Sequence, residues 1–383
     1  MRRMLAKTIV RLAAIILPAS RRDWGRAMVA ELAAIERPGA ALAFALGCLA
    51  GALRQTMSSH LLDPNQALEG TSVMHQGSSM LSHTRRLAAQ CAIGAIGLGL
   101  AYMIAAGAPL SYPAMNVAAL AIGLLAVGVL TDAGRLWPIA GGAVGVALAS
   151  LILLTSLFGI SADGATRWIS AGGILLQPGL FLVPIVALGF ARARDSASLL
   201  AVLIASLALA LQPDRAMAGA LAAAMAALAL ARPERIVLLA LGAALAAFAA
   251  TLVRADASPA MPFVDQIFYS SFGVHPLAGF AVLGGAALML VPAIAGYIRD
   301  PDHRHIYAVF GAVWLAVLLA AALGNYPTPL VGYSGSAILG YLLSLLGLPS
   351  RAATLGIGRD GPAARPEPEE QQPNPRAELS AAG

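Results

Sequence analysis

The sequence predicts an all-α, polytopic integral membrane protein, and its composition and its apolar runs are the two main observations. Hydrophobic residues make up 59% of the 383-residue chain and charged residues only 11%, whereas a soluble domain carries about 25% charged residues. Apolar runs of roughly 17–23 residues recur from residue 87 to residue 348, which is long enough to cross a hydrocarbon core about 30 Å thick.

About ten membrane-spanning helices are expected from the positions of these runs. Their many Ala, Leu and Gly residues suit close helix packing in lipid, where small side chains let two backbones approach. Two of the runs are short for a span, which leaves a count that differs by one as an alternative. The expected spans are residues 87–107, 113–131, 138–160, 178–191, 196–211, 215–231, 236–253, 277–298, 306–323 and 336–348.

The distribution of arginine predicts the orientation of these spans. If the first span runs outward, the outer loops hold only Arg167, Arg215 and Arg254. Cytoplasmic loops of membrane proteins carry an excess of Lys and Arg. We therefore expect both ends of the ten-helix region, and the C-terminus after it, to lie in the cytoplasm. The loops then placed in the cytoplasm hold Arg135, Arg192, Arg194, Arg232, Arg235, Arg299 and Arg304.

The chain divides into four parts. They are a membrane-associated helical extension, a polar linker, the ten-helix membrane domain and a disordered cytoplasmic tail rich in Pro and Glu, at residues 1–57, 58–86, 87–348 and 349–383. In the extension, arginines surround an apolar stretch, a pattern typical of an amphipathic helix on an anionic membrane surface. The apolar run 38–53 either forms a shallow interfacial arrangement or spans together with residues 8–20.

No cofactor or metal site is expected, although a divalent cation is left open. Cys48 and Cys91 both lie in apolar segments, where a small buried side chain is the simplest interpretation. The histidines of the linker, His60, His75 and His83, have spacings more typical of solvated residues than of metal ligands.

Polar segments interrupt the apolar runs at positions that the topology places on one membrane face. They are Gly164-Ala-Thr-Arg-Trp-Ile-Ser-Ala-Gly-Gly-Ile-Leu-Leu-Gln-Pro178, Leu211-Gln-Pro-Asp-Arg215, Pro262-Phe-Val-Asp-Gln-Ile-Phe268 and Asn325-Tyr-Pro-Thr-Pro-Leu-Val-Gly-Tyr-Ser-Gly-Ser336. We predict that their polar side chains converge on one outward-facing site. The alternative is that Trp, Tyr and Arg anchor the helices at the interface, while Pro and Gly end them.

The order of these motifs resembles the SEDS family (shape, elongation, division and sporulation proteins) of the FtsW, RodA and SpoVE type. The resemblance covers residues 87–348 and implies the ten-helix fold of that family. It also implies peptidoglycan glycosyltransferase activity, in which lipid-linked disaccharide-peptide precursor is polymerised at the outer face of the bacterial inner membrane, in cell division or cell shape. The implied partners are a class B penicillin-binding protein or other membrane proteins of the division or elongation machinery; no nucleic acid is expected.

The resemblance also implies roles for individual residues. Asp265 matches the catalytic aspartate of the family, and a carboxylate can act as general base on an acceptor sugar hydroxyl. A guanidinium such as that of Arg167 can balance the charge of a departing pyrophosphate. The substrate-binding positions implied by the motifs are Arg167, Trp168, Gln177, Gln212, Asp214, Tyr333 and Ser336.

Departures from the family pattern keep a second hypothesis open. After Gln177-Pro178 the family usually continues Ser-Glu-x-x-Lys, whereas the apolar run Gly179-Leu-Phe-Leu-Val183 stands here. Phe263 and Val264 replace the His-Thr that usually precedes the aspartate. The chain is therefore either a polymerase or a non-catalytic relative that scaffolds an envelope complex or binds a polyprenyl lipid. A transporter is disfavoured, because charges occur only at the ends of the spans.

Overall fold

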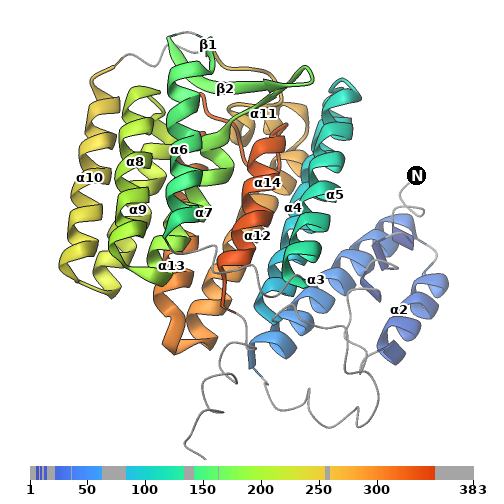
Figure 1. The fold of residues 1–383 in the computed structure, drawn as a ribbon. Helices are drawn as coiled ribbons and strands as arrows, with labels where there is room; N and C mark the ends of the chain where they lie inside the picture. The colour runs from blue at the N-terminus through green and yellow to red at the C-terminus, as the bar shows by residue number, and fades with distance from the viewer. Residues whose placement is uncertain are drawn as a thin grey trace, which may run out of the picture.

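The computed structural model describes residues 6–7, 9–10, 13–14, 22–35, 37–62, 83–132, 142–162, 164–254 and 259–349. Within these residues, ten helices lie side by side in one bundle (Figure 1). Each matches one of the predicted spans, so the predicted fold class is confirmed. The helices are α4 (His83–Ala105), α5 (Ser111–Asp132), α6 (Ala143–Phe158), α7 (Pro178–Ala193), α8 (Ser196–Leu211), α9 (Arg215–Ala231), α10 (Arg235–Leu252), α12 (Pro276–Arg299), α13 (Arg304–Leu323) and α14 (Gly335–Ser344).

The helices differ in length. Five of them are long and apolar enough to cross a membrane, namely α4, α5, α10, α12 and α13. The span of α13 includes the 3-10 helix η2 (Pro301–His303) that precedes it. The others are apolar helices of 10–17 residues. A short span can be accommodated by local thinning of the bilayer at modest cost. The short spans include α7 and α14, which lie in the interior of the bundle and bury most of their residues against other helices.

One end of the bundle carries a small antiparallel sheet. Strands β1 (Ile160–Ala162), β2 (Ala165–Ala171) and β3 (Ile174–Leu176) pair in the order β1-β2-β3. The residues that pair across β2 and β3 leave Gly172 and Gly173 as a two-residue turn, both with positive φ (58° and 82°). Two-residue hairpins favour such a turn because its twist matches that of the strands. The segment predicted as a polar loop is thus a hairpin, and we call this end of the bundle the hairpin end.

A large hydrophobic core fills most of the bundle, and α14 lies within it. A smaller buried cluster, which includes Tyr102, Val282 and Val331, is separate from it. Trp314 and Phe310 of α13 pack edge-on against Tyr341 of α14, with ring centroids 5.2 and 5.5 Å apart. The phenolic oxygen of Tyr341 donates a hydrogen bond to the carbonyl of Met289 (2.9 Å). Gly340 allows α14 to approach α7 closely, since a Cβ at this position would collide with the backbone at Leu180.

The opposite end of the bundle, which we call the arginine end, carries a buried and a half-buried guanidinium group that cap a helix. The 3-10 helix η3 (Leu345–Gly347) extends α14 and finishes with backbone carbonyls that lack helical partners. Arg85 of α4 donates to the carbonyls of Leu346 (2.9 Å) and Leu348 (3.1 Å). Arg192 of α7 donates to the carbonyl of Gly347 (3.0 Å). These two side chains fix the end of α14 to two neighbouring helices.

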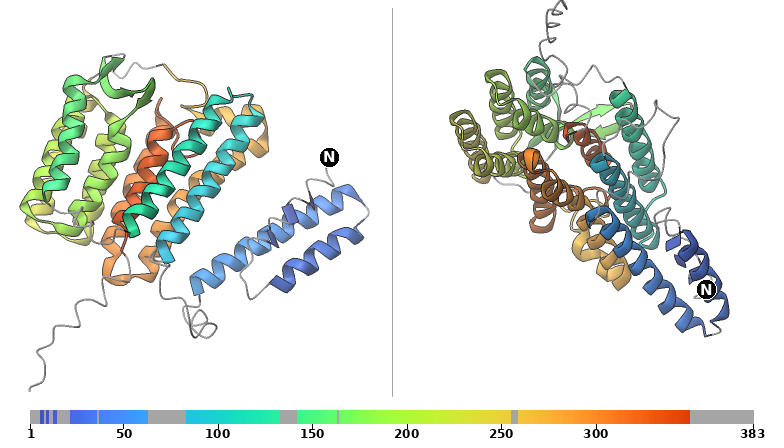
Figure 2. Two further views of the ribbon diagram at one scale, coloured as in Figure 1. Left: turned by 45° about the vertical axis from the view of Figure 1, so that its right-hand side comes forward. Right: turned by 90° about the horizontal axis from the view of Figure 1, so that it is seen from below.

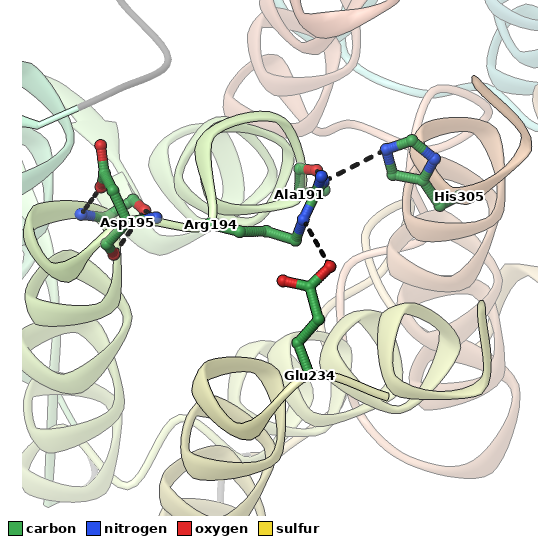
Figure 3. A network of polar contacts seen from close by, with 6 residues as sticks. Ala191, Arg194, Asp195, Glu234 and His305 are labelled. Carbon is green, nitrogen blue, oxygen red and sulfur yellow. Dashed lines mark hydrogen bonds and ion pairs between the residues drawn. The ribbon is translucent and has the colours of Figure 1, made fainter. Parts of the chain in front are cut away.

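A second polar network at the arginine end joins three helices (Figure 3). Arg194, in the left-handed conformation after α7, forms an ion pair with Glu234 just before α10 (3.2 Å) and contacts His305 of α13 (3.4 Å). Asp195 caps α8 by accepting a hydrogen bond from the backbone N–H of Ser198 (2.7 Å). Hydrogen bonds from Ser198 hold the pKa of Asp195 below its usual value.

The predicted separation of the arginines is confirmed as a separation between the two ends. Arg167, Arg215 and Arg254 belong to the hairpin end, where α6, α8 and α10 finish. Arg135 lies outside the described residues. Which end faces the cytoplasm stays a prediction. The remaining arginines of the predicted cytoplasmic set, Arg192, Arg194, Arg232, Arg235, Arg299 and Arg304, lie at or beside the arginine end.

The N-terminal helices α2 (Arg22–Ala34) and α3 (Pro38–Leu62) form a unit with a small core of its own (Figure 2). Leu32 of α2 and Ala41, Ala45 and Cys48 of α3 belong to this core, separately from the core of the bundle. Helix α3 continues through Leu62, past the predicted start of the linker. The remaining linker, residues 63–82, and the predicted tail from residue 350 onward lie outside the described residues, and the domain boundaries stay predictions.

Cysteine labelling will test the orientation. Ser170 on β2 and Asp302 in η2 are exposed at opposite ends, and the native thiols of Cys48 and Cys91 are buried. If the hairpin end faces the periplasm, a membrane-impermeant maleimide should label Ser170→Cys in intact cells. Asp302→Cys should react only after permeabilisation. Labelling of Asp302→Cys alone in intact cells would reverse the assigned orientation.

The separate N-terminal core predicts that the bundle folds without the extension. A chain that starts at His83, the first residue of α4, should insert into the membrane and elute as a single species from size-exclusion chromatography in detergent. Because the core formed by α2, α3 and the described residues between positions 6 and 13 is separate from the core of the bundle, its loss should expose little of the bundle core. Aggregation or rapid degradation of the truncated chain would show that the extension stabilises the bundle.

Candidate functional site

The structure brings the four predicted motif segments to the hairpin end. Residues 160–176 form the sheet, residues 211–215 join α8 to α9, and residues 259–266 lead into the short helix α11 (Ile267–Val274). Residues 324–334 join α13 to α14. Figure 1 shows the sheet and α11 at this end of the bundle. The predicted convergence on one face is therefore confirmed at the level of the segments.

The carboxylate of Asp265 is held by its own turn. Its Oδ2 accepts a hydrogen bond from the backbone N–H of Met261 (2.8 Å), and the backbone N–H of Asp265 donates to the carbonyl of Met261 (3.0 Å). Asp265 is only 9% exposed, although Met261 and Gln266 beside it are exposed. Burial raises the pKa of Asp265 above its usual value, and the hydrogen bond from Met261 opposes this shift in part.

The Asp265 turn is bound to the segment before α14 by backbone hydrogen bonds. The N–H of Thr328 donates to the carbonyl of Val264 (2.9 Å), and that of Tyr333 donates to the carbonyl of Phe263 (2.8 Å). These bonds join residues 64 and 70 positions apart in the sequence; they place the catalytic candidate and the Tyr333 segment in one unit.

Backbone strain is concentrated in this unit. Phe263, Gln266 and Leu330 have φ values of 65°, 53° and 62°. Such left-handed conformations of residues other than glycine cost on the order of 1–3 kcal/mol each, and they persist where the surrounding structure enforces them, often at functional sites.

Two residues of α5, which sequence reasoning missed, hold the Tyr333 segment. Asn116 is fully buried; its Nδ2 donates to the carbonyl of Gly332 (2.7 Å), and its Oδ1 accepts from the N–H of Ser334 (3.2 Å). The ring of Tyr112 stacks on that of Tyr333, with centroids 4.2 Å apart and an interplanar angle of 12°. The available signal was a lone asparagine within an apolar run, because a buried amide in a span needs partners.

Three of the predicted substrate-binding residues form hydrogen bonds with one another. Gln177, at the start of α7, donates from Nε2 to Oδ2 of Asp214 (2.9 Å), and its backbone N–H donates to Oγ of Ser336 (3.0 Å). Asp214 is fully buried and caps α9 through the backbone N–H of Met217 (3.2 Å). We call this arrangement the Gln177 latch, because it joins the starts of α7, α9 and α14.

Of the other predicted substrate-binding residues, Tyr333 belongs to the Asp265 unit described above, and Arg167, Gln212 and Trp168 lie elsewhere at the hairpin end. Arg167 on β2 is buried and donates to the carbonyl of Pro213 (2.6 Å). Gln212 is buried and donates from Nε2 to the carbonyl of Ile152 (2.7 Å). Trp168 is half-buried on β2, where it pairs in register with Ile160. The contact of these residues with a substrate stays a prediction.

The apolar run that replaces the expected charged residues is packed into the core. Gly179, Leu180, Leu182 and Val183 are all buried. A Cβ at Gly179 would lie 3.3 Å from Oδ2 of Asp214, so the latch leaves little room for a larger side chain. Across the described parts of the chain, no group of three His, Cys, Asp or Glu side chains is arranged to hold a metal ion.

Comparison with known proteins shows the fold. No protein-family model and no curated protein matches the sequence. The chain is similar to two crystal structures of the rod shape determining protein RodA from Thermus thermophilus, each 22% identical. The first, a variant with one aspartate replaced by alanine, gives a TM-score of 0.50 over 68% of this chain and 94% of that chain. The second gives 0.49 over 68% and 93%. The chain thus has a RodA-like fold, as the sequence resemblance implied.

The position of Asn116 predicts a measurable loss of stability when its amide is removed. Asn116→Leu keeps a similar branched shape but leaves the carbonyl of Gly332 and the N–H of Ser334 without their partner. Each buried polar group left unpaired costs about 1–3 kcal/mol, so the midpoint of thermal unfolding in detergent should fall. Gln90→Leu on the exposed face of α4 serves as the control and should leave the midpoint unchanged. Equal midpoints for the two variants would contradict this role.

Proposed function

We propose that the chain is a divergent SEDS protein that polymerises a lipid-linked disaccharide-peptide precursor of peptidoglycan, with Asp265 as the general base. The observation that carries the proposal is the state of this carboxylate. It lies at the hairpin end of a RodA-like fold, on a strained loop, with one oxygen bound by the Met261 N–H and a pKa raised by burial. A carboxylate with a raised pKa is a stronger base than an ordinary aspartate, and such groups are candidates for catalysis.

The proposed step is a glycosyl transfer. Asp265 takes the proton from a hydroxyl group of the acceptor sugar, and the oxygen of that group forms a bond to the anomeric carbon of the donor. The bond from that carbon to the pyrophosphate breaks, and the polyprenyl pyrophosphate leaves with the bonding electrons. Arg167 is proposed to balance the negative charge of the departing pyrophosphate. In the structure its guanidinium donates to the carbonyl of Pro213, which precedes Asp214 of the Gln177 latch.

The proposal includes a location and partners. The hairpin end would face the periplasm, the C-terminus the cytoplasm, and the bundle would lie in the bacterial inner membrane. A class B penicillin-binding protein or another membrane protein of the division or elongation machinery would assemble beside it. The apolar helices and the RodA-like fold support membrane embedding.

The Gln177 latch favours a second candidate function. The latch residues form hydrogen bonds with one another, which occupy groups that could otherwise bind a substrate. Apolar side chains stand where the family usually carries Glu and Lys. A protein that scaffolds an envelope complex or binds a polyprenyl lipid would keep such a latch without needing turnover. The two functions differ in their dependence on Asp265.

Replacement of Asp265 by Asn separates the two functions. The amide keeps the shape of the side chain but cannot take a proton, so polymerisation of lipid-linked precursor by the purified protein should fall by roughly a hundredfold or more. The amount of inserted protein should stay the same. Asp302→Asn, an exposed change at the arginine end, is the matched control. Full complementation in cells by Asp265→Asn would rule out the polymerase and leave the scaffold.

The raised pKa of Asp265 also predicts how stability depends on pH. Because the folded-state pKa lies above the unfolded value of about 4, this group stabilises the fold most below the unfolded pKa. That contribution is lost as the pH rises through the folded-state pKa. Asp265→Asn, which stays neutral, should be at least as stable as the native chain at pH 7, and its unfolding midpoint should change less between pH 4 and pH 7. If Asp265→Asn were less stable than the native chain at pH 7, that result would contradict the raised pKa of Asp265.

A further inference from the structure

The hydroxyl group of Thr328 is buried beside the Asp265 turn. Thr328 is fully buried, and its backbone N–H binds the carbonyl of Val264, the residue that precedes Asp265. Among the residues that the structure describes, its Oγ1 has no hydrogen-bond partner. Thr328 belongs to none of the roles inferred from the sequence.

Oδ1, the second carboxylate oxygen of Asp265, is also buried and has no hydrogen-bond partner among the described residues. Oδ2, in contrast, accepts a hydrogen bond from the N–H of Met261. A buried polar group without a partner costs about 1–3 kcal/mol. The two groups lie on segments that a backbone hydrogen bond joins, so one polar ligand is a candidate partner for both.

A hydroxyl group is the ligand that would satisfy both. Oδ1 of an ionised Asp265 can only accept, while the Thr328 hydroxyl can donate. An alcohol placed between them would give its proton to Oδ1 and accept a hydrogen bond from Thr328 on one lone pair. The other lone pair of the alcohol oxygen would then stay available for bond formation.

We propose that Thr328 is a second substrate-contacting residue, which binds the acceptor hydroxyl together with Asp265. This inference rests on the proposed glycosyltransferase function and extends it. Thr328 orients the acceptor oxygen while Asp265 removes its proton, so the attacking lone pair is directed at the donor carbon. Fixing the orientation of a nucleophile in this way raises the rate of reaction.

The test uses the full-length purified protein and lipid-linked precursor. Thr328→Val replaces the hydroxyl by a methyl group of similar size, and turnover should fall roughly tenfold, as expected for the loss of one hydrogen bond to the reacting group. The unfolding midpoint should not fall, because the hydroxyl has no protein partner to lose. Thr328→Ser keeps the hydroxyl and should restore most of the turnover.

Thr251→Val is the matched control. Thr251 is also a buried threonine at the hairpin end, but its Oγ1 donates to the carbonyl of Phe248 (2.6 Å). This variant should keep its turnover and lose some stability, which is the opposite of the result expected for Thr328→Val.

The double variant of Thr328→Val with Asp265→Asn gives the sharpest readout. If both side chains act on the same hydroxyl, their effects are not independent, and the double variant should be little slower than Asp265→Asn alone. Normal turnover of Thr328→Val, or losses that multiply in the double variant, would overturn the role of Thr328 while the function of Asp265 stands. A native chain without polymerase activity would overturn both proposals.

Discussion

The need to pair buried backbone groups determines the arrangement of the hairpin end. Residues 328–332 lie buried among the helices without forming a helix themselves, so their N–H and carbonyl groups need hydrogen-bond partners within the protein. Val331 and Gly332 donate to carbonyls inside the segment, whereas the N–H of Thr328 and that of the following residue, Tyr333, bind the carbonyls of Val264 and Phe263. The carbonyl of Gly332 accepts from the side chain of Asn116. The position of the Asp265 turn is therefore a consequence of the hydrogen bonds that this buried segment requires, and the strained residues on both segments are tolerated because these bonds enforce them.

The same requirement divides the polar residues of the site into two groups. Gln177, Asp214 and Ser336 satisfy one another and join three helices, which makes them part of the framework. Asp265 and Thr328 each keep a buried oxygen that no described residue satisfies. The structure thus places an internally paired framework and two side chains with unpaired buried oxygens at one end of the bundle; Oε1 of Gln212 is likewise buried without a partner among the described residues.

The helices can be predicted from the sequence because a long apolar run in lipid forms a helix, which pairs its own backbone N–H and carbonyl groups. The polar composition of residues 161–178 predicts a loop and not the hairpin, although Gly172-Gly173 between two extended segments is a signal for a two-residue turn. Asn116 and Thr328 were harder to find. The amide of Asn116 binds a carbonyl 216 residues away, and one sequence contains no information on pairings over that distance. The residues implied by family resemblance reached the correct end of the bundle, but their mutual hydrogen bonds could only come from the structure.

Helix α14 is attached at both of its ends, which has a consequence for the changes in chain length that the protein can tolerate. Ser336 binds the backbone of Gln177 at one end, while Arg85 and Arg192 hold the carbonyls of η3 at the other. One inserted residue would shift the far end by about 1.5 Å and rotate it by about 100°, so both attachments could not be kept. An insertion at the exposed turn of Gly172 and Gly173 changes no such distance. Natural variation in length should therefore accumulate in the hairpin and be excluded from α14.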